Sequence, residues 1–159
     1  MSQRGTITFA RVDSRLIHGQ IVTKWAKSSG ANTIYIIDDA VRSDDFSMDI
    51  YMASGKRYGF QVKVYSIAEV LAAWEANQFG ADKVFALFKT VATAIKCLEL
   101  GLPLPCLNLG GTPKRQSAEF FIKNVALTET ELEQLQQLSA EKGIKIYAQT
   151  VPEAAKKSI

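Results

Sequence analysis

Short apolar runs alternate with segments of helical periodicity along this chain, and this alternation constrains the fold more than any other feature. Strands are expected at 6–12, 33–37, 61–65, 82–88, 104–109 and 145–149. Helices are expected between them, at 19–28, 44–58, 66–77, 90–100 and 128–142. Because parallel strands need crossovers of this length, the pattern predicts one α/β domain over residues 1–159. Its sheet should be open and mainly parallel, with helices on both faces and room for an antiparallel edge strand.

Local signals support several of the predicted helix ends. Ser66 and Glu69 have the spacing of a capping box at the start of one helix. Gly59, Gly101 and Gly143 each follow the last residue of a helical pattern, where glycine commonly ends a helix. These signals indicate where the helices begin and end, which periodicity alone does not.

Composition excludes several classes of protein. With 159 residues, 47% hydrophobic and 22% charged, the chain resembles an ordinary globular domain, and its net charge of +3 is too small to suggest nucleic-acid binding. Cys97 and Cys106 lack metal-ligand spacing, so packed, reduced thiols are expected. The sequence contains neither a bilayer-spanning apolar run nor a signal-peptide pattern, which predicts a cytoplasmic protein. Aromatic side chains are expected in the core rather than in a sugar-binding platform: Trp25, Phe85, Phe88, Phe120 and Phe121.

The single histidine of the chain, His18, is the strongest candidate for a reactive group. One imidazole cannot build a zinc site, but it can act as a nucleophile or proton carrier when neighbouring charges tune it. Arg11 and Arg15 offer forked, permanently charged donors to a phosphoryl group on the ring. Asp13 offers an acceptor to the other ring nitrogen, or a partner for an arginine.

The surroundings of His18 in the sequence also suit an anion. A predicted helix follows the loop, so a phosphate on the ring would face the N–H groups of the first helical turn, near Gln20. Ser14, in the loop itself, is expected to help bind the phosphate or hold the loop. Gly19 allows the backbone to pass close to the ring. The alternative is that His18 caps the helix and the arginines form surface ion pairs. The clustering of charges favours phosphate chemistry.

Ligands of open α/β sheets bind outside the carboxyl ends of the strands. Several predicted strands end in polar or glycine-rich loops, and four of their residues are expected to border the His18 site: Asp39, Lys89, Gly110 and Gly111. The Asp38–Asp39 pair is interpreted as loop-forming, with Asp39 supporting the His18 loop, rather than as a magnesium site. Gly110–Gly111 fits either a close backbone approach to a ligand or a tight turn.

The run from Arg11 to Trp25 resembles the active-site signature of the IIB components of one class of the bacterial phosphoenolpyruvate-dependent sugar phosphotransferase system (PTS), the mannose/fructose/sorbose class. The resemblance continues through Ile37–Asp39, Leu107–Gly111 and Gln149–Pro152. It implies a phosphocarrier. A histidine at the position of His18 would take phosphate on Nδ1 from a phosphohistidine of IIA, and would pass it to a sugar held by the membrane subunits IIC and IID.

The resemblance also implies residue roles and partners. The chain would be a protein-Nπ-phosphohistidine–sugar phosphotransferase in which Arg15 steadies the phosphoryl group, while Arg11 and Asp13 match other motif positions. Neither metal nor organic cofactor is implied, and the protein would associate peripherally with its membrane subunits. Some basic residues fit either a docking rim for IIA or a merely soluble surface: Lys24, Lys27, Lys114 and Arg115. A non-catalytic, phosphorylation-sensing or phosphate-binding module stays open as an alternative function. The sequence leaves open which sugar is transported, whether the chain forms a homodimer and whether IIA is a separate chain.

Overall fold

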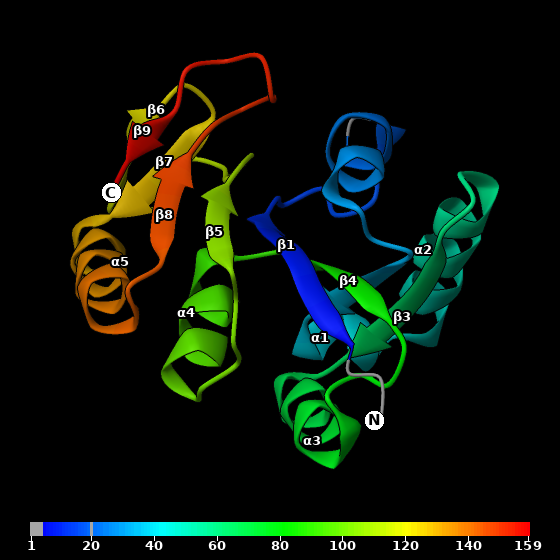
Figure 1. Cartoon of the computed structure of the whole chain (residues 1–159). Coiled ribbons are helices and arrows are strands. Elements are labelled where there is room, and N and C mark those ends of the chain that lie inside the picture. Colours follow the sequence, from blue (N-terminus) through cyan, green and yellow to red (C-terminus); the bar gives the residue numbers. More distant parts are fainter. Residues whose placement is uncertain (1–4, 20) are drawn as a thin grey trace.

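The computed structural model describes residues 5–19 and 21–159, in which most strands join one sheet (Figure 1). The strand order of this sheet is β3-β2-β4-β1-β5-β8-β9. The strands are β1 (Thr6–Val12), β2 (Thr33–Ile37), β3 (Gln61–Tyr65), β4 (Lys83–Phe88), β5 (Cys106–Leu109), β8 (Lys145–Ala148) and β9 (Lys157–Ser158). Two further strands, β6 (Ala118–Ile122) and β7 (Val125–Thr128), form a separate antiparallel hairpin.

All pairings in the sheet are parallel except that of β9, which runs antiparallel to β8 at the edge. The register aligns the carboxyl ends of the central strands, because Val12 pairs with both Phe88 and Leu109, and Ile37 also pairs with Phe88. The loops that follow these strands therefore leave from one edge. The predicted α/β class, with its mainly parallel sheet and antiparallel edge, is confirmed.

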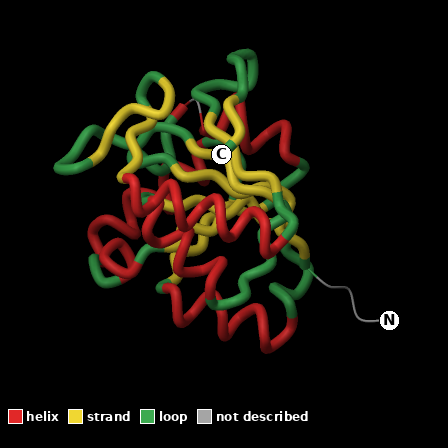
Figure 2. The backbone as a smooth tube through the Cα atoms, turned by 90° about the vertical axis from the view of Figure 1, so that its left-hand side faces the viewer, coloured by secondary structure: helices red, strands yellow, loops and turns green. Residues whose placement is uncertain are grey.

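The helices form two layers, one on each side of the sheet, and each layer packs on the sheet through its own apolar cluster (Figure 2). One cluster packs the sheet against α3 (Ile67–Asn77), α4 (Val91–Glu99) and α5 (Glu129–Lys142). The other packs it against the segment after β1, α1 (Asp39–Arg42) and α2 (Asp45–Arg57). The neighbouring strands β1 and β5 thus send their connections to opposite faces. Such a switch point leaves a crevice at the carboxyl ends of the strands.

The segment after β1 departs from the predicted helix 19–28. It forms a short π-helical stretch, η1 (Ile21–Ala26), followed by a 3₁₀ turn, η2 (Lys27–Ser29). The hydroxyl of Thr23 donates to the carbonyl of Gly19 (2.7 Å), and that of Ser28 donates to the carbonyl of Lys24 (3.0 Å). Such side-chain bonds to the preceding turn, together with β-branched residues, disfavour a regular α-helix.

Other differences are smaller. The predicted strand 104–109 begins only at Cys106, and β9 had no signal in the sequence. The capping box of Ser66 and Glu69 is confirmed at the start of α3. Trp25, Phe85 and Phe88 are buried as predicted, but the prediction was wrong for Phe120, which is 57% exposed, and Phe121 is half-buried; both lie on the small hairpin. Both cysteines are free thiols, Cys97 buried and Cys106 partly so.

Candidate functional site

The loop that carries His18 is pinned by backbone hydrogen bonds at its start. The N–H of Asp13 donates to the carbonyl of Phe88 (2.9 Å), and the N–H of Ser14 donates to that of Gly111 (2.8 Å). A turn follows, in which the N–H of Leu16 donates to the carbonyl of Asp13 (3.0 Å). Leu16 has a φ of +56°, unusual for a leucine, and its fully buried side chain holds it in that conformation. The loop is therefore anchored in the core before it reaches His18.

A buried carboxylate, that of Asp13, lies at the centre of the charged cluster. Its Oδ2 is 3.4 Å from Nε2 of His18 and 3.5 Å from Nη2 of Arg11. Its Oδ1 accepts from the N–H of Arg15 (3.1 Å) and is 3.9 Å from Nε of that side chain. Burial acts to raise the pKa of Asp13, but the His18 side chain, the Arg15 N–H and the Arg11 charge together lower it below its ordinary value. Asp13 is thus an anion at neutral pH.

The edge of the His18 ring that carries Nε2 is turned inward. Its Nε2 is buried and lies close to Asp13 without forming a hydrogen bond to another described residue, while the side chain as a whole stays 19% exposed. An imidazole held in this way can act as a nucleophile through its other nitrogen.

Arg11 is buried, and its two terminal nitrogens bind other groups of the protein. Its Nη1 donates to Oδ1 of Asn108 and to the carbonyl of Gln149 (3.0 Å), and its Nη2 donates to the carbonyl of Thr150 (3.0 Å). The guanidinium also lies 4.3 Å from the centroid of the Trp25 ring. Burial lowers the pKa of Arg11 to about 10, so the group remains charged at neutral pH. Arg11, near the end of β1, therefore connects this strand to the segment after β8.

The two glycines after β5 have different surroundings. A Cβ on Gly110 would overlap Nη2 and Cζ of Arg11 and come within 2.7 Å of its Nε. A Cβ on Gly111 would lie at an ordinary 3.5 Å from Oδ1 of Asp13. The space that a side chain on Gly110 would need is thus occupied by the Arg11 guanidinium. The close approach there is made by the protein's own arginine.

A cavity of about 390 Å³ opens beside this cluster, at the crevice between β1 and β5. It is lined by Arg11, Asp13, Arg15, Gly111, Asn124, Thr150 and Val151. The Arg15 side chain is 64% exposed, in contrast to that of Arg11, and so can reach a group that enters from solvent. The site therefore presents one exposed cation above a buried network of charges.

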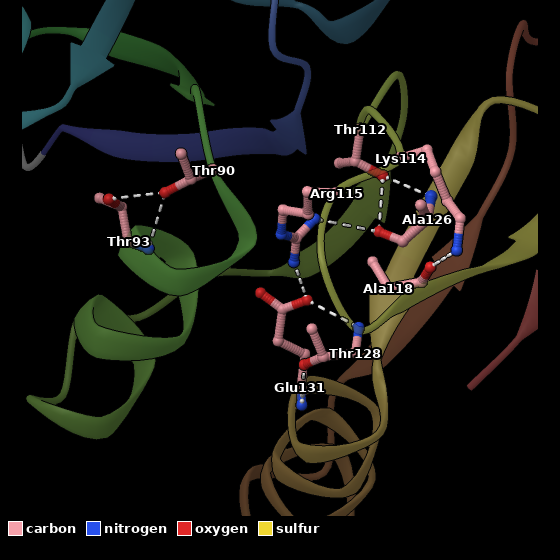
Figure 3. Close-up of polar contacts among 9 residues, drawn as sticks. All are labelled: Thr90, Thr93, Thr112, Lys114, Arg115, Ala118, Ala126, Thr128 and Glu131. Carbon is pink, nitrogen blue, oxygen red and sulfur yellow. Dashed lines mark hydrogen bonds and ion pairs between the residues drawn. The ribbon is translucent and has the colours of Figure 1, made fainter.

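A second cavity, of about 320 Å³, includes Ser14 and Lys89 in its lining. This places the predicted border residue Lys89 next to the loop. On its far wall Arg115 reaches the carbonyl of Ala126 (3.4 Å) and the carboxylate of Glu131 (Figure 3). Lys114 likewise contacts the carbonyl of Ala118, so two of the basic residues expected at a docking rim contact groups of the protein itself while staying exposed.

The remaining predicted site residues are placed as follows. Asp39 accepts from the N–H of Ile67 (2.8 Å) and so caps the start of α3, and among the described residues no hydrogen bond or ion pair joins it to the His18 loop. Chain neighbours aside, the atom nearest to a Cβ on Gly19 would be Oη of Tyr58, at 3.8 Å. Gln20 lies outside the described residues. Among the residues described, no three His, Cys, Asp or Glu side chains gather as metal ligands.

Sequence reasoning placed Asn108 and the segment Gln149–Thr150 in the family resemblance but gave them no role in the site, where they hold Arg11. Asn108 carried a usable signal, because an amide in an otherwise apolar buried strand needs a partner. Gln149 and Thr150 follow β8, a strand that ends at the same edge as β1, so the rule on carboxyl ends applied to them too.

Comparison with known proteins identifies the family of this chain. Residues 7–159 match the family model described as the PTS system sorbose subfamily IIB component. The sorbose-specific EIIB component of Lacticaseibacillus casei is 31% identical over 145 residues, which cover 91% of this chain and 87% of the relative. The N-acetylgalactosamine-specific phosphotransferase enzyme IIB component 1 of Escherichia coli is 27% identical over 96% of each chain.

The crystal structure of manxB from Thermoanaerobacter tengcongensis superimposes with a TM-score of 0.89 at 35% identity, over 99% of this chain and 94% of that one. In the part of the chain that the structure describes, no helix has the length and apolar character to cross a membrane. Motif, fold and relatives therefore agree that this chain belongs to the sorbose subfamily of IIB components of the bacterial sugar phosphotransferase system.

Proposed function

We propose that this chain is a cytoplasmic phosphocarrier whose reactive group is His18. IIB components work with a IIA protein and with the membrane subunits IIC and IID. In the proposed cycle, His18 accepts a phosphoryl group from a phosphohistidine of IIA and transfers it to a sugar held by IIC and IID.

The contact between His18 and Asp13 carries this proposal. Because Nε2 faces the buried carboxylate at 3.4 Å, Nδ1 is the nitrogen left to attack phosphorus. As the new N–P bond forms and the N–P bond of the donor breaks, positive charge develops on the His18 ring. The Asp13 carboxylate, already charged and fixed in position, stabilises that charge without rearrangement.

In the second step the His18 ring loses the positive charge that it gained in the first. A sugar hydroxyl attacks phosphorus, the bond to Nδ1 breaks, and the electron pair returns to the His18 ring. The hydroxyl proton is lost to a base on the sugar-binding side. Arg15, exposed beside the cavity, donates to the phosphoryl oxygens in both steps.

Arg11 was expected to donate to the phosphoryl group, but the proposal gives it a different role. Its terminal nitrogens are used by Asn108, Gln149 and Thr150, so it is assigned no contact with phosphate. It acts as a positioning residue that fixes Asp13, which in turn orients the His18 ring.

Intact-mass spectrometry tests the proposal. The protein is incubated with phosphoenolpyruvate, enzyme I, HPr and a IIA of the sorbose class, in parallel with His18→Ala. A single acid-labile phosphate on the wild type alone is expected. Acceptance by His18→Ala, or by neither protein, would overturn the carrier role. Phosphate that is accepted but never passed to sugar by membranes containing IIC and IID would instead support a phosphorylation-sensing module.

A further inference from the structure

The outward face of α2 is unusually apolar for a surface helix. Phe46 is 74% exposed, and Ile50 and Met52 are each 47% exposed. Among the described residues, these are three of the five large hydrophobic side chains exposed to this degree, so they are concentrated on one element. Phe46, Ile50 and the exposed Ala53 follow the spacing of a single helix face. Large apolar side chains grouped on one helix face in this way suit an interaction surface.

The charges on the same helix are divided between its two ends. Asp45 and Asp49 lie in its first half, and Lys56 and Arg57 lie at its last turn; all four are exposed. None of the four forms an ion pair with any other described residue. The first half of this helix surface therefore carries acidic side chains beside its apolar ones, and the last turn is basic.

A groove of about 580 Å³ adjoins the basic end of the face. It is lined by Met52, Ala53, Lys56, Gly59, Phe60, Gln61 and Val62, and so runs between α2 and β3. In the described sheet, β3 is an edge strand whose partner is β2. The groove thus lies at the edge of the described sheet.

We propose that this face binds the same face of a second copy of the chain, with the two α2 helices antiparallel about a two-fold axis. A surface with opposite charges at its two ends is complementary to itself in this arrangement. With the axis level with Tyr51, Asp45 of one copy comes level with Arg57 of the second copy. Phe46 then comes level with Lys56, at the groove beside Met52. Each copy supplies one aromatic side chain and receives one.

The self-association surface is separate from the phosphocarrier site. Its residues line neither of the two cavities beside the His18 loop. The proposal therefore does not depend on the proposed function, and each can fail alone.

Sedimentation equilibrium over a wide concentration range tests the self-association. The wild type is expected to dimerise, and Phe46→Glu is expected to raise the dissociation constant at least tenfold. Phe120→Glu is the matched control, because Phe120 is 57% exposed on the distant hairpin, and it should leave the dimer unchanged. A circular dichroism spectrum and a urea unfolding midpoint like those of the wild type show that Phe46→Glu is folded.

Charge exchange tests the two-fold geometry itself. Asp45→Lys and Arg57→Asp should each weaken the dimer because they bring like charges together, and the double variant should restore it. Failure of the double variant to recover would reject the antiparallel pairing. A wild type that stays monomeric at all concentrations would overturn the proposal. If Phe46→Glu then lowers sugar phosphorylation by IIC and IID membranes, the face binds a transporter subunit instead.

Discussion

Nε2 of His18 lies 3.4 Å from Oδ2 of Asp13, and this carboxylate is buried between two arginines. The pair is asymmetric in its environment: Asp13 is removed from solvent, while the His18 ring keeps one part exposed. A fixed negative charge beside Nε2 suits a reaction in which the ring becomes positive as Nδ1 bonds to phosphorus. This relationship connects the fold to the proposed chemistry.

Asp13→Asn removes that charge and keeps the shape of the side chain. We expect phosphoryl transfer from IIA to His18 to slow on the order of 10²-fold, because the developing ring charge loses its partner. Stability should also fall, since the buried Arg11 loses its anionic neighbour. Stopped-flow or quench-flow transfer rates, measured where circular dichroism shows both proteins folded, separate the two effects. An unchanged rate would remove Asp13 from the mechanism.

Arg15 should matter through its forked donors. Arg15→Ala is expected to slow onward transfer to sugar by roughly 10²- to 10³-fold, the usual effect of losing one donor to a charged transition state. Arg15→Lys should recover part of that loss, because a lysine keeps the charge but not the fork. Lys24→Ala is the control: this exposed lysine pairs with Glu153 and should change the rate little. Equal effects of the Arg15 and Lys24 changes would indicate only a general loss of positive charge.

The two glycines after β5 give a matched pair of alanine variants. Gly110→Ala should lower the free energy of unfolding by about 1–3 kcal/mol, because its Cβ would displace the Arg11 guanidinium. It should also impair phosphorylation, since Arg11 then no longer fixes Asp13. Gly111→Ala should change stability by less than about 0.5 kcal/mol, as its Cβ meets Asp13 at an ordinary distance. Urea unfolding checks both, and a harmless Gly110→Ala would contradict the packing described for Arg11.

Stability should depend on pH through Asp13. Its pKa in the folded protein is below the ordinary value of 3.8, so the folded state binds fewer protons than the unfolded state as the solution is acidified. The contribution of Asp13 is therefore fully present above that ordinary value, and it is lost as the pH falls through the lower folded pKa. Urea unfolding at a series of pH values should show a smaller acid-induced loss of stability in Asp13→Asn than in the wild type. Identical profiles would contradict the charged, stabilised state of Asp13.

Much of the fold was predictable because its signals are local. The strand at 6–12 and the capping box at Ser66 depend on alternation and on side-chain bonds within four residues, and both appear as predicted. The segment 19–28 was harder, since its hydrophobic spacing is helical while its hydroxyl groups bond to the turn before them. The small edge strand β9 exists only through pairing with β8, which no local pattern records.

The site was predictable as a list of charges but not as an arrangement. Sequence spacing placed Arg11 and Arg15 symmetrically about Asp13, and both therefore looked available to phosphate. In the structure, strand alternation and the Asn108 side chain take Arg11 into the interior, and only Arg15 is exposed. That distinction depends on contacts between residues about 100 positions apart, which motif spacing cannot encode.

The nitrogen of His18 that carries phosphate is the most direct test of the proposed mechanism. Long-range ¹H–¹⁵N NMR spectra of the ¹⁵N-labelled protein, recorded before and after phosphorylation by IIA, distinguish the two ring nitrogens. Phosphate on Nδ1 is expected, with Nε2 still facing Asp13. Phosphate on Nε2, or on any residue other than His18, would contradict the mechanism derived from the His18–Asp13 contact.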